Sequence, residues 1–386
     1  MKYLYLVWKN LWRRKTRTFL TLLSTIVAFL LFGLLAAVRT GFLAGVDVSG
    51  IDRLMVTHKV TIILPLPVSY LERIKAVGGV ETITHATWFG GIYKDPKNFF
   101  PQMAVDTDTY LDLYPEMLIS DAQRKAWQED RTGAIVGRAI ADRFGWKVGD
   151  RVPLDAPWPR KDGTRNWTFT IDGIYEGAQK ETDTSALFFH NDYFRESLAG
   201  TFASGTVGWY IIRISDPARA VAIGKQIDGM FANSPAETKT QTEKEMAKGF
   251  ANQVGNIGAL VTWIVAAVFL TLLLAVGNTM ALSIRERTGE LAVLKTLGFH
   301  HRQVVFLVLA ESCAAALAGG LIGLGLALAV IPGMAKALAR FLPVFFVPTK
   351  YVVLGVALSL LLGLAAGLPP ALAAMRLRIV DALRRV

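Results

Sequence analysis

The chain has 386 residues, of which 52% are hydrophobic and 19% are charged, and its formal net charge is +11. So large an apolar share argues against a single soluble domain and favours a membrane protein. The charge does not indicate nucleic acid, because residues 41–257 carry 24 Lys and Arg against 27 Asp and Glu, so that the basic excess lies in the rest of the chain.

The chain begins with a basic, amphipathic stretch that predicts a helix lying at the inner membrane surface over residues 1–17. Its apolar residues recur at helical spacing: Leu4, Val7, Trp8 and Leu11. The uncharged run that follows, within residues 18–40, is about 21 residues long, whereas the core of a signal peptide has about 7–15. We therefore predict a retained first transmembrane helix. Cleavage at Leu35-Ala36-Ala37 is the alternative.

Residues 41–257 are long enough to form a large domain outside the membrane with its own core. The stretch "PVSYLERIKAVGGVETITHATW" predicts a helix followed by a strand, and "GWYIIRISDPARAVAIGKQIDGMF" predicts a strand followed by a helix. In the second stretch, Asp216 caps the expected helix and Pro217 takes its first position. The residues expected to point inward are Val221, Ile227 and Met230.

These two units, at about residues 41–94 and 206–257, flank a strand-rich insert at about residues 95–205. Within the insert, "GAIVGRAIADRFGWKVGDRVPL" predicts a helix, a Gly-Asp turn and a strand. The stretch "NWTFTIDGIYEG" alternates with period two, which is typical of a half-buried strand. The predicted fold class is an α-helical membrane protein with four transmembrane helices and a large α+β extracytoplasmic domain between the first and the second.

Three further apolar runs are each long enough to cross the membrane as a helix, which takes about 20 residues. They lie at residues 258–284, 303–331 and 351–375, and they are followed by a short connection at 285–302, a loop at 332–350 and a tail at 376–386. Basic residues gather before the first run, in the short connection and in the tail, which predicts that these parts are cytoplasmic. Both termini are then inside, and residues 41–257 are outside.

The sequence offers no set of residues equipped for catalysis. It lacks the Gly-x-x-x-x-Gly-Lys-Ser/Thr phosphate loop and the Gly-x-Ser-x-Gly motif of serine hydrolases. The histidines of the large domain, His58, His85 and His190, lack the spacing of a zinc site and are interpreted as surface or packing residues. The single cysteine, Cys313, lies in an apolar run. We expect no catalytic residue, metal or cofactor in this chain.

One ionisable residue stands inside the third apolar run. Glu311 lies about nine residues beyond Arg302, or roughly 14 Å along a helix. Steps of four residues from it form a stripe of small residues: Ala315, Gly319, Gly323 and Ala327. Such a stripe allows another helix to approach closely. Glu311 either hydrogen-bonds across this helix contact or belongs to a proton or substrate relay; we prefer the structural role, because a relay needs further ionisable groups in the spans.

The connection between the second and third runs predicts a short helix of mixed charge. Charged residues surround an apolar patch, and a glycine follows as its C-terminal cap. The residues are Arg285, Arg287, Glu290, Leu291, Leu294, Lys295, Leu297 and Gly298. A loop that only marks the cytoplasmic side would need Lys and Arg alone. The acidic residues favour a surface that fits a groove of another protein, where apolar anchors bind and charges set the register.

These residues resemble a family signature. "RERTGELAVLKTLGFHHRQ" is similar to the motif of the permeases typified by FtsX, MacB and LolC, in which Arg-x-Arg-x-x-Glu-(Ile/Leu)-x-x-Leu-(Lys/Arg)-x-Leu-Gly follows the second span. "IVGRAIADRFGWKVGDRVPL" resembles a motif of the periplasmic core domain of that family. The order of one span, a large domain and three more spans also matches, over essentially the whole chain.

The resemblance implies the permease subunit of an ABC transporter of the mechanotransmission type in the bacterial inner membrane. Residues 285–302 would be the coupling helix, the flanking units of the large domain a MacB-like porter, and the insert a sabre subdomain. Two copies of a cytosolic ATPase would supply ATP and Mg, and a second permease chain, identical or related, would complete the dimer. The cargo would be a lipid, lipoprotein, peptide or drug. Membrane lipids, a periplasmic adaptor and an outer-membrane duct are further partners that the resemblance allows.

A rival reading is an FtsX-like transmembrane signalling subunit, which activates an extracytoplasmic enzyme and moves no cargo. A membrane-embedded enzyme is a third reading, and it would need clustered catalytic groups that the sequence does not display.

Overall fold

The computed structural model describes residues 15–48, 50–198, 200–253, 257–297, 300–338, 342 and 344–375. The chain divides into two units. A membrane unit comprises residues 1–41, 256–337 and 345–386, and an α/β unit comprises residues 42–255 and 338–344. Each has its own hydrophobic clusters. The predicted surface helix up to residue 14 and the tail at 376–386 lie outside the described residues.

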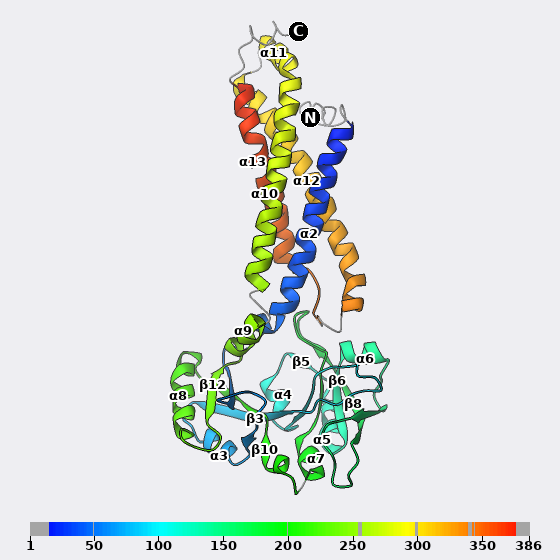
Figure 1. The fold of residues 1–386 in the computed structure, drawn as a ribbon, viewed down its shortest axis with the longest axis vertical. Coiled ribbons are helices and arrows are strands. Elements are labelled where there is room, and N and C mark those ends of the chain that lie inside the picture. Colours follow the sequence, from blue (N-terminus) through cyan, green and yellow to red (C-terminus); the bar gives the residue numbers. More distant parts are fainter. Residues whose placement is uncertain are drawn as a thin grey trace. The chain divides into compact units, whose positions relative to one another are not determined.

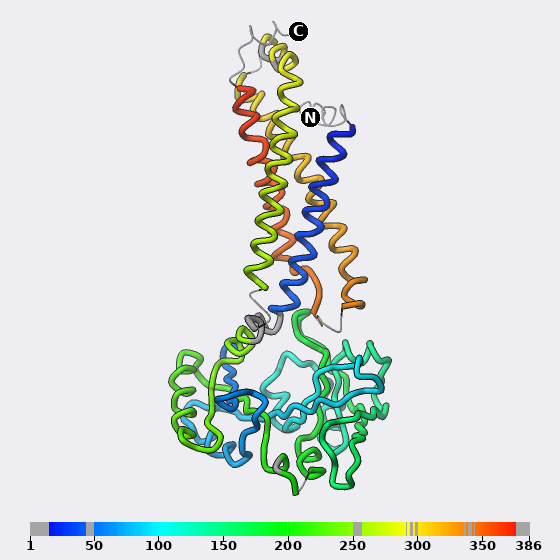
Figure 2. Tube along the Cα trace, viewed as in Figure 1, coloured from blue at the N-terminus to red at the C-terminus, as the bar shows by residue number. Residues whose placement is uncertain are grey.

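The membrane unit contains four helices that are long and apolar enough to cross a membrane. They are α2 (Lys15–Val48), α10 (Ile257–Glu286), α12 (His301–Leu338) and α13 (Thr349–Met375). The described parts of these helices lie alongside one another in a bundle (Figures 1 and 2). The prediction of four spans with a large domain after the first is confirmed. The helix α12 continues beyond the predicted end at residue 331, through Pro332 and Gly333 into the helix formers "MAKAL".

Aromatic side chains form the centre of this bundle. The rings of Phe29 and Phe32 on α2 both meet Phe269 on α10 edge to face, with centroids 5.1 Å and 6.0 Å away. Such pairs add about 0.5–1.5 kcal/mol beyond their buried area. Small and aliphatic residues of α12 and α13 complete the same cluster.

The α/β unit is built on one mixed sheet of ten strands among the residues described. The strand order is β12-β1-β11-β3-β4-β9-β6-β8-β5, and β7 also pairs with β8. Their bounds are β1 Arg53–His58, β3 Val80–Trp88, β4 Gln102–Val105, β5 Met117–Leu118, β6 Gly133–Gly137, β7 Arg151–Asp155, β8 Asn166–Gly177, β9 Leu187–His190, β11 Trp209–Ile214 and β12 Thr238–Thr242. A separate pair joins β2 (Leu66–Pro67) to β10 (Thr206–Val207).

Helices cover both faces of this sheet (Figure 1). They are α3 Tyr70–Lys75, α4 Tyr110–Leu113, α5 Asp121–Glu129, α6 Arg138–Phe144, α7 Asn191–Ser197, α8 Ala220–Met230 and α9 Glu243–Gln253, with 3₁₀ turns η1 Phe202–Gly205 and η2 Pro217–Arg219. Successive strand residues point to opposite faces. Thus Ile211 joins the cluster under α4 and α5, whereas Ile212 joins the cluster under α3 and α8.

The helix–strand and strand–helix units predicted at the two ends of this region are confirmed as α3–β3 and β11–α8. Their strands are antiparallel neighbours, with Thr84 opposite Ile211. As predicted, Asp216 caps the turn at Pro217 by accepting a hydrogen bond from the amide of Ala218.

Two details of the prediction were wrong. Val221 is 68% exposed rather than inward, and Ile223 is buried in its place. The reason is the helical period: Ala220, Ile223 and Gly224 lie seven, four and three residues before Ile227 and share its buried face, whereas Val221 lies six residues before it and is off that face. In addition, "GAIVG" before α6 is strand β6, a short apolar run buried on both sides that periodicity cannot distinguish from a helix.

The division of this region into a porter and an insert stays a prediction. The sheet continues across the predicted boundary through the pairing of β3 with β4, where Ala86 lies opposite Val105. One cluster of buried residues likewise draws on both sides of it, from Ala86 and Ile211 to Phe188.

Candidate functional site

The connection between α10 and α12 folds into the helix α11 (Thr288–Thr296). The amide of Arg287 donates to the carbonyl of Ile284, at 3.1 Å. The Thr288 hydroxyl donates to the carbonyls of Arg285 and Ile284, at 2.7 Å and 3.2 Å. These bonds satisfy carbonyls that the end of α10 leaves open. A nine-residue helix is marginal in isolation, so α11 depends on contacts with its neighbours.

An ion pair supplies one of those contacts. The Arg287 guanidinium donates to both carboxylate oxygens of Glu311 on α12, at 2.9 Å and 3.3 Å. Its Nε lies 3.5 Å from Glu290, one turn further along α11. The side chains of Arg287 and Glu311 are only 20% and 12% exposed, so solvent screens the pair weakly. The structure therefore brings three of the predicted residues together, and the carboxyl inside α12 has a cationic partner at the start of α11. The ion pair therefore holds the start of α11 against α12.

A second ion pair fixes the end of α10 to α2. Arg17 donates to Glu286, at 2.8 Å, and to the Ser283 hydroxyl, at 3.0 Å. Beneath these pairs lies a small apolar core from three helices, which consists of Ile284, Val304, Val308, Ala371 and Ala374. The end of α10, which leads into α11, is therefore held by α2, α12 and α13 together.

The outer side of α11 is exposed. Val293 and Leu297 are 46% and 72% accessible, whereas Ala292 between the helix and its neighbours is 2% accessible. Arg285, near the end of α10, and Glu290, on α11, are also exposed. The side chains of Leu291, Leu294 and Lys295 and the whole of Gly298 lie outside the described residues. The described part of α11 therefore presents an exposed apolar face, with charged residues nearby, on a helix whose start is fixed by an ion pair.

The small-residue stripe of α12 packs against α2. A Cβ added at Gly323 would lie 2.4 Å from the carbonyl oxygen of Ile26, and one at Gly319 would lie 2.7 Å from the side chain of Thr25. Further along, a Cβ at Gly33 of α2 would lie 2.5 Å from Ala327. Ala315 and Ala327 are buried. The stripe thus mediates a close contact between two helices of the same chain.

A second close contact, between α12 and α13, escaped the sequence analysis. The Ser312 hydroxyl donates to the carbonyl of Gly363, at 2.8 Å, and a Cβ at Gly363 would lie 2.6 Å from the Cα of Cys313. The signal was available, because α13 carries its own four-residue repeat of small residues: Gly355, Ser359, Gly363 and Gly367.

The α/β unit contains a buried ionic cluster that sequence analysis also missed. Arg53 at the start of β1 is 4% exposed and donates to both oxygens of Glu116, at 2.6 Å and 3.1 Å. Its Nε donates to Glu243, the first residue of α9, at 2.6 Å. The guanidinium also lies over the ring of Tyr114 and donates to the carbonyl of Leu113. The cluster ties β1 to α9 and to the segment before β5. Because Glu116 and Glu243 lie 63 and 190 residues from Arg53 in the chain, no local sequence pattern indicates that they pair.

The histidines serve packing. His85 meets Asn191 at 2.8 Å, His190 contacts the carbonyl of Trp127, and His58 accepts the amide of Val60. Burial lowers the pKa of His85. Among the residues that the structure describes, no three His, Cys, Asp or Glu side chains gather as ligands for a metal.

One pair of carboxyls is brought together by the sheet. The parallel pairing of β6 with β8 places Asp172 beside Gly133 and near Asp130. Burial, and then the charge of Asp130, raise the pKa of Asp172 to about 6. The sequence interpretation singled out no carboxyl pair, and it could not, since this one depends on strand register.

Comparisons with known proteins concern both units. Residues 256–379 match the family model described as FtsX-like permease C-terminal. A protein of Methanocaldococcus jannaschii named uncharacterized ABC transporter permease is 23% identical over 97% of this chain and 96% of its own length. The Bacillus subtilis permease YvrN is 36% identical over 28% of this chain and 25% of its length. MacB of Bdellovibrio bacteriovorus, named a macrolide export ATP-binding/permease protein, is 33% identical over 28% of this chain and 16% of its length.

Two solved structures are similar to parts of the chain. The extracellular domain of YknZ, from Gram-positive bacteria, gives a TM-score of 0.36 at 10% identity and covers 50% of this chain and 100% of that domain. The periplasmic region of MacB from Actinobacillus actinomycetemcomitans gives a TM-score of 0.38 at 12% identity and covers 54% of this chain and 96% of that region.

Proposed function

We propose, from the match of residues 256–379 to the model described as FtsX-like permease C-terminal, that the chain is the membrane subunit of an ABC transporter driven by mechanotransmission. In this proposal, ATP binding and hydrolysis in a separate cytosolic ATPase move α11, and the spans carry that movement to the α/β unit, which acts on a cargo outside the membrane. The observation that carries the proposal is the exposed apolar face of a short helix whose start is tied to α12 by the Arg287–Glu311 ion pair.

The exposure of α11 supports docking to a partner. Val293 and Leu297 expose much of their apolar surface, and the charged residues Arg285 and Glu290 are exposed as well. Burying a Leu or Val side chain contributes about 1.5–3 kcal/mol, and charged neighbours fix the orientation of a complex. A groove lined with apolar residues on the partner would satisfy both features.

The Arg287–Glu311 ion pair supports transmission of movement. A push on α11 passes to α12 through Arg287 and Glu311, and to α10 through the single connecting residue, Arg287. Charge-assisted hydrogen bonds with two contacts resist bending better than a single neutral bond. Because α11 has few residues of its own to deform, it moves with α10 and α12.

The motor and its nucleotide belong to a partner in this proposal. The sequence has no phosphate-binding loop, so two copies of a cytosolic ATPase supply ATP and Mg. A second permease chain completes the assembly. In α10, 17% of the most apolar stretch is buried, against 33–44% in the other spans, which leaves room for that chain or for lipid. We place the protein in the bacterial inner membrane, with α11 and both termini in the cytoplasm. An adaptor and an outer-membrane duct stay predictions from the resemblance.

Substitution of Leu297 by Glu tests the docking face. Leu297→Glu puts a charge on the exposed apolar surface and is expected to weaken ATPase binding by about tenfold or more, since about 1.5–3 kcal/mol of burial is lost. The purified permease, reconstituted in lipid, should then fail to stimulate the partner ATPase at concentrations that saturate the wild-type complex.

Val221→Glu is the matched control. Val221 is 68% exposed on the α/β unit, close to the 72% of Leu297, so both variants should fold and insert alike. Stimulation by Val221→Glu should equal that of the wild type. If Leu297→Glu also stimulates the ATPase like the wild type, α11 is not the docking element.

A further inference from the structure

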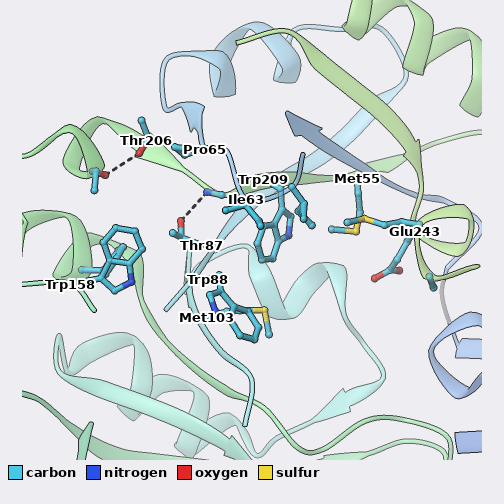
Figure 3. Close-up of a pocket in the computed structure, with 16 residues that line it drawn as sticks. Met55, Ile63, Pro65, Thr87, Trp88, Met103, Trp158, Thr206, Trp209 and Glu243 are labelled. Carbon is cyan, nitrogen blue, oxygen red and sulfur yellow. Dashed lines mark hydrogen bonds between the residues drawn. The ribbon is translucent and has the colours of Figure 1, made fainter. Parts of the chain in front are cut away.

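The α/β unit contains a pocket of about 810 Å³, a volume within the range of small-molecule sites. Figure 3 shows its lining, which comes from the loop before β2, from β3, β4 and β11, and from the start of α9. Several walls are therefore strands of the central sheet, and the hydrogen bonds between these strands fix their positions. The proposed coupling through α11 makes no use of this pocket.

Aromatic and thioether side chains dominate the lining. They are Trp88, Trp158, Trp209, Phe194, Met55, Met103 and Met246. Trp88 packs on the ring of Phe99, with centroids 6.0 Å apart, and is still 40% exposed, so part of its indole is open to a ligand. Methionine is flexible and polarizable and adapts to ligands of irregular shape, and tryptophan is the aromatic residue that attracts cations most strongly.

Polar groups in the wall are largely engaged by the protein itself. The Thr87 hydroxyl accepts the amide of Gly208 at 3.1 Å, and the Thr206 hydroxyl donates to the carbonyl of Ala203 at 3.2 Å. The indole N–H of Trp158 donates to the carbonyl of Phe89 at 2.8 Å. A ligand therefore gains affinity here through apolar burial and ring contacts more than through neutral hydrogen bonds.

The charged end of the pocket carries more negative than positive charge. Glu243 lines it, and this carboxylate belongs to the cluster in which the single guanidinium of Arg53 faces both Glu243 and Glu116. The nearby Arg213 has its own carboxylate, Asp52, at 3.4 Å. These groups sum to one negative charge beside an apolar cavity, where screening by water is weak, and the Tyr114 hydroxyl also donates to Glu243 at 3.1 Å.

We propose that this pocket binds an amphiphilic organic cation, with an apolar, ring-bearing body against the tryptophans and methionines and its positive charge toward Glu243. That this ligand is the transported cargo rests on the proposed function, whereas its binding to the pocket does not. Anionic amphiphiles are disfavoured by the same carboxylate.

Tetraphenylphosphonium and tetraphenylborate test the proposal, because they have nearly the same shape and opposite charge. The full-length protein is placed in nanodiscs of zwitterionic lipid, and binding of each ion is measured by equilibrium dialysis with empty nanodiscs subtracted. The phosphonium should bind at least about tenfold more tightly than the borate. Glu243→Gln should reduce this preference several-fold. Equal binding of the two ions, tighter binding of the borate, or binding of neither would overturn the proposal.

Two further variants locate the binding. Ala247→Trp fills the pocket from α9 and should lower phosphonium affinity at least about tenfold, whereas Lys248→Trp, on the exposed side of the same helix, should leave it unchanged. Trp88→Ala removes an exposed ring without overpacking and should weaken binding several-fold. Wild-type affinity in both Ala247→Trp and Trp88→Ala would place the ion elsewhere and refute the site.

The readout is independent of the ATPase. Leu297→Glu should bind the phosphonium like the wild type, so a failure of the docking proposal leaves this binding intact. Conversely, loss of binding in Ala247→Trp with normal basal ATPase stimulation is the pattern expected of a ligand-site variant.

Discussion

At the scale of single residues, Arg53 carries the most consequential interactions of the α/β unit. Burial opposes its charge, but hydrogen bonds to Glu116 and the charge of Glu243 outweigh burial and raise the pKa of the guanidinium above its usual value. Arg53 therefore stays charged at every pH at which the protein folds. It follows the first span in the chain, and Glu243 opens the helix that precedes the second span, so the cluster joins the two entry segments of this unit.

Replacing Arg53 tests how much this cluster contributes to the free energy of unfolding. Arg53→Met leaves two carboxylates buried without a cation, and breaking a buried pair in this way costs about 3–5 kcal/mol. Arg124→Met removes an ion pair with Asp112 in which the side chains are 31% and 54% exposed, and should cost less than about 1 kcal/mol. Chemical unfolding of the full-length protein, followed by tryptophan fluorescence, compares the two variants. Similar losses in both would show that the buried cluster adds nothing beyond a surface pair.

The contrast between Arg53 and Arg287 shows what single residues reveal in a sequence. Arg287 and Glu290 are three residues apart in a charged stretch between apolar runs, so a short helix there could be predicted, although Arg287 itself lies just before the first residue of α11. The partner of Arg287 in α12, Glu311, was singled out as an unusual carboxyl, but its pairing was not foreseen. Arg53 is one arginine among many, and only the folded chain brings Glu116 and Glu243 to it.

At the scale of elements, the four spans could be predicted because length and hydropathy suffice in a membrane. The small-residue stripe of α12 was also visible, but the sequence could not say which helix lies against it. The structure assigns it to α2 and shows that α13 approaches another face of α12 through Ser312 and Gly363. The same repeat of four thus serves two different contacts.

Substitution of Gly323 by Val tests the α2–α12 contact. The new side chain would meet the backbone of Ile26, which cannot rotate away, and overpacking of this kind costs about 1–3 kcal/mol. Gly325→Val is the control, because the same change on the same helix meets nothing within 4 Å. The thermal unfolding midpoint of the protein in detergent should fall for Gly323→Val relative to Gly325→Val. Equal midpoints would mean that α2 does not pack on this stripe.

In the α/β unit, local patterns predicted individual elements better than their boundaries. The long strand β8 alternates cleanly, and its prediction is confirmed, because one of its faces is buried and the other is partly exposed. In contrast, β6 is buried throughout and has no alternation to detect. In α8 the prediction of Val221 failed because this residue lies six positions before Ile227, which takes it off the buried face that Ala220, Ile223 and Gly224 share with Ile227.

At the scale of the whole molecule, the sequence predicted the order of units but not how the α/β unit is assembled. Its sheet pairs strands that are far apart in the chain, such as β1 with both β11 and β12. Strand order of this kind depends on contacts across long separations, which periodicity does not record. The apolar pocket likewise arises only from assembly, since its lining residues extend from Met55 to Ala247.

The central claim is that a cytosolic motor acts on α11 to change the α/β unit across the membrane. This requires the two to lie on opposite sides of the bilayer. The chain has one natural cysteine, Cys313, so that a Cys313→Ala background allows single-site labelling. Leu297→Cys and Val221→Cys report on α11 and on the α/β unit, since both positions are exposed.

The most direct measurement is therefore labelling of these two variants by a membrane-impermeant maleimide in cells whose inner membrane is intact, and again after lysis. The account predicts that Val221→Cys is labelled in both conditions and Leu297→Cys only after lysis. Labelling of both cysteines before lysis, or protection of both, would place α11 and the α/β unit on the same side and contradict the account.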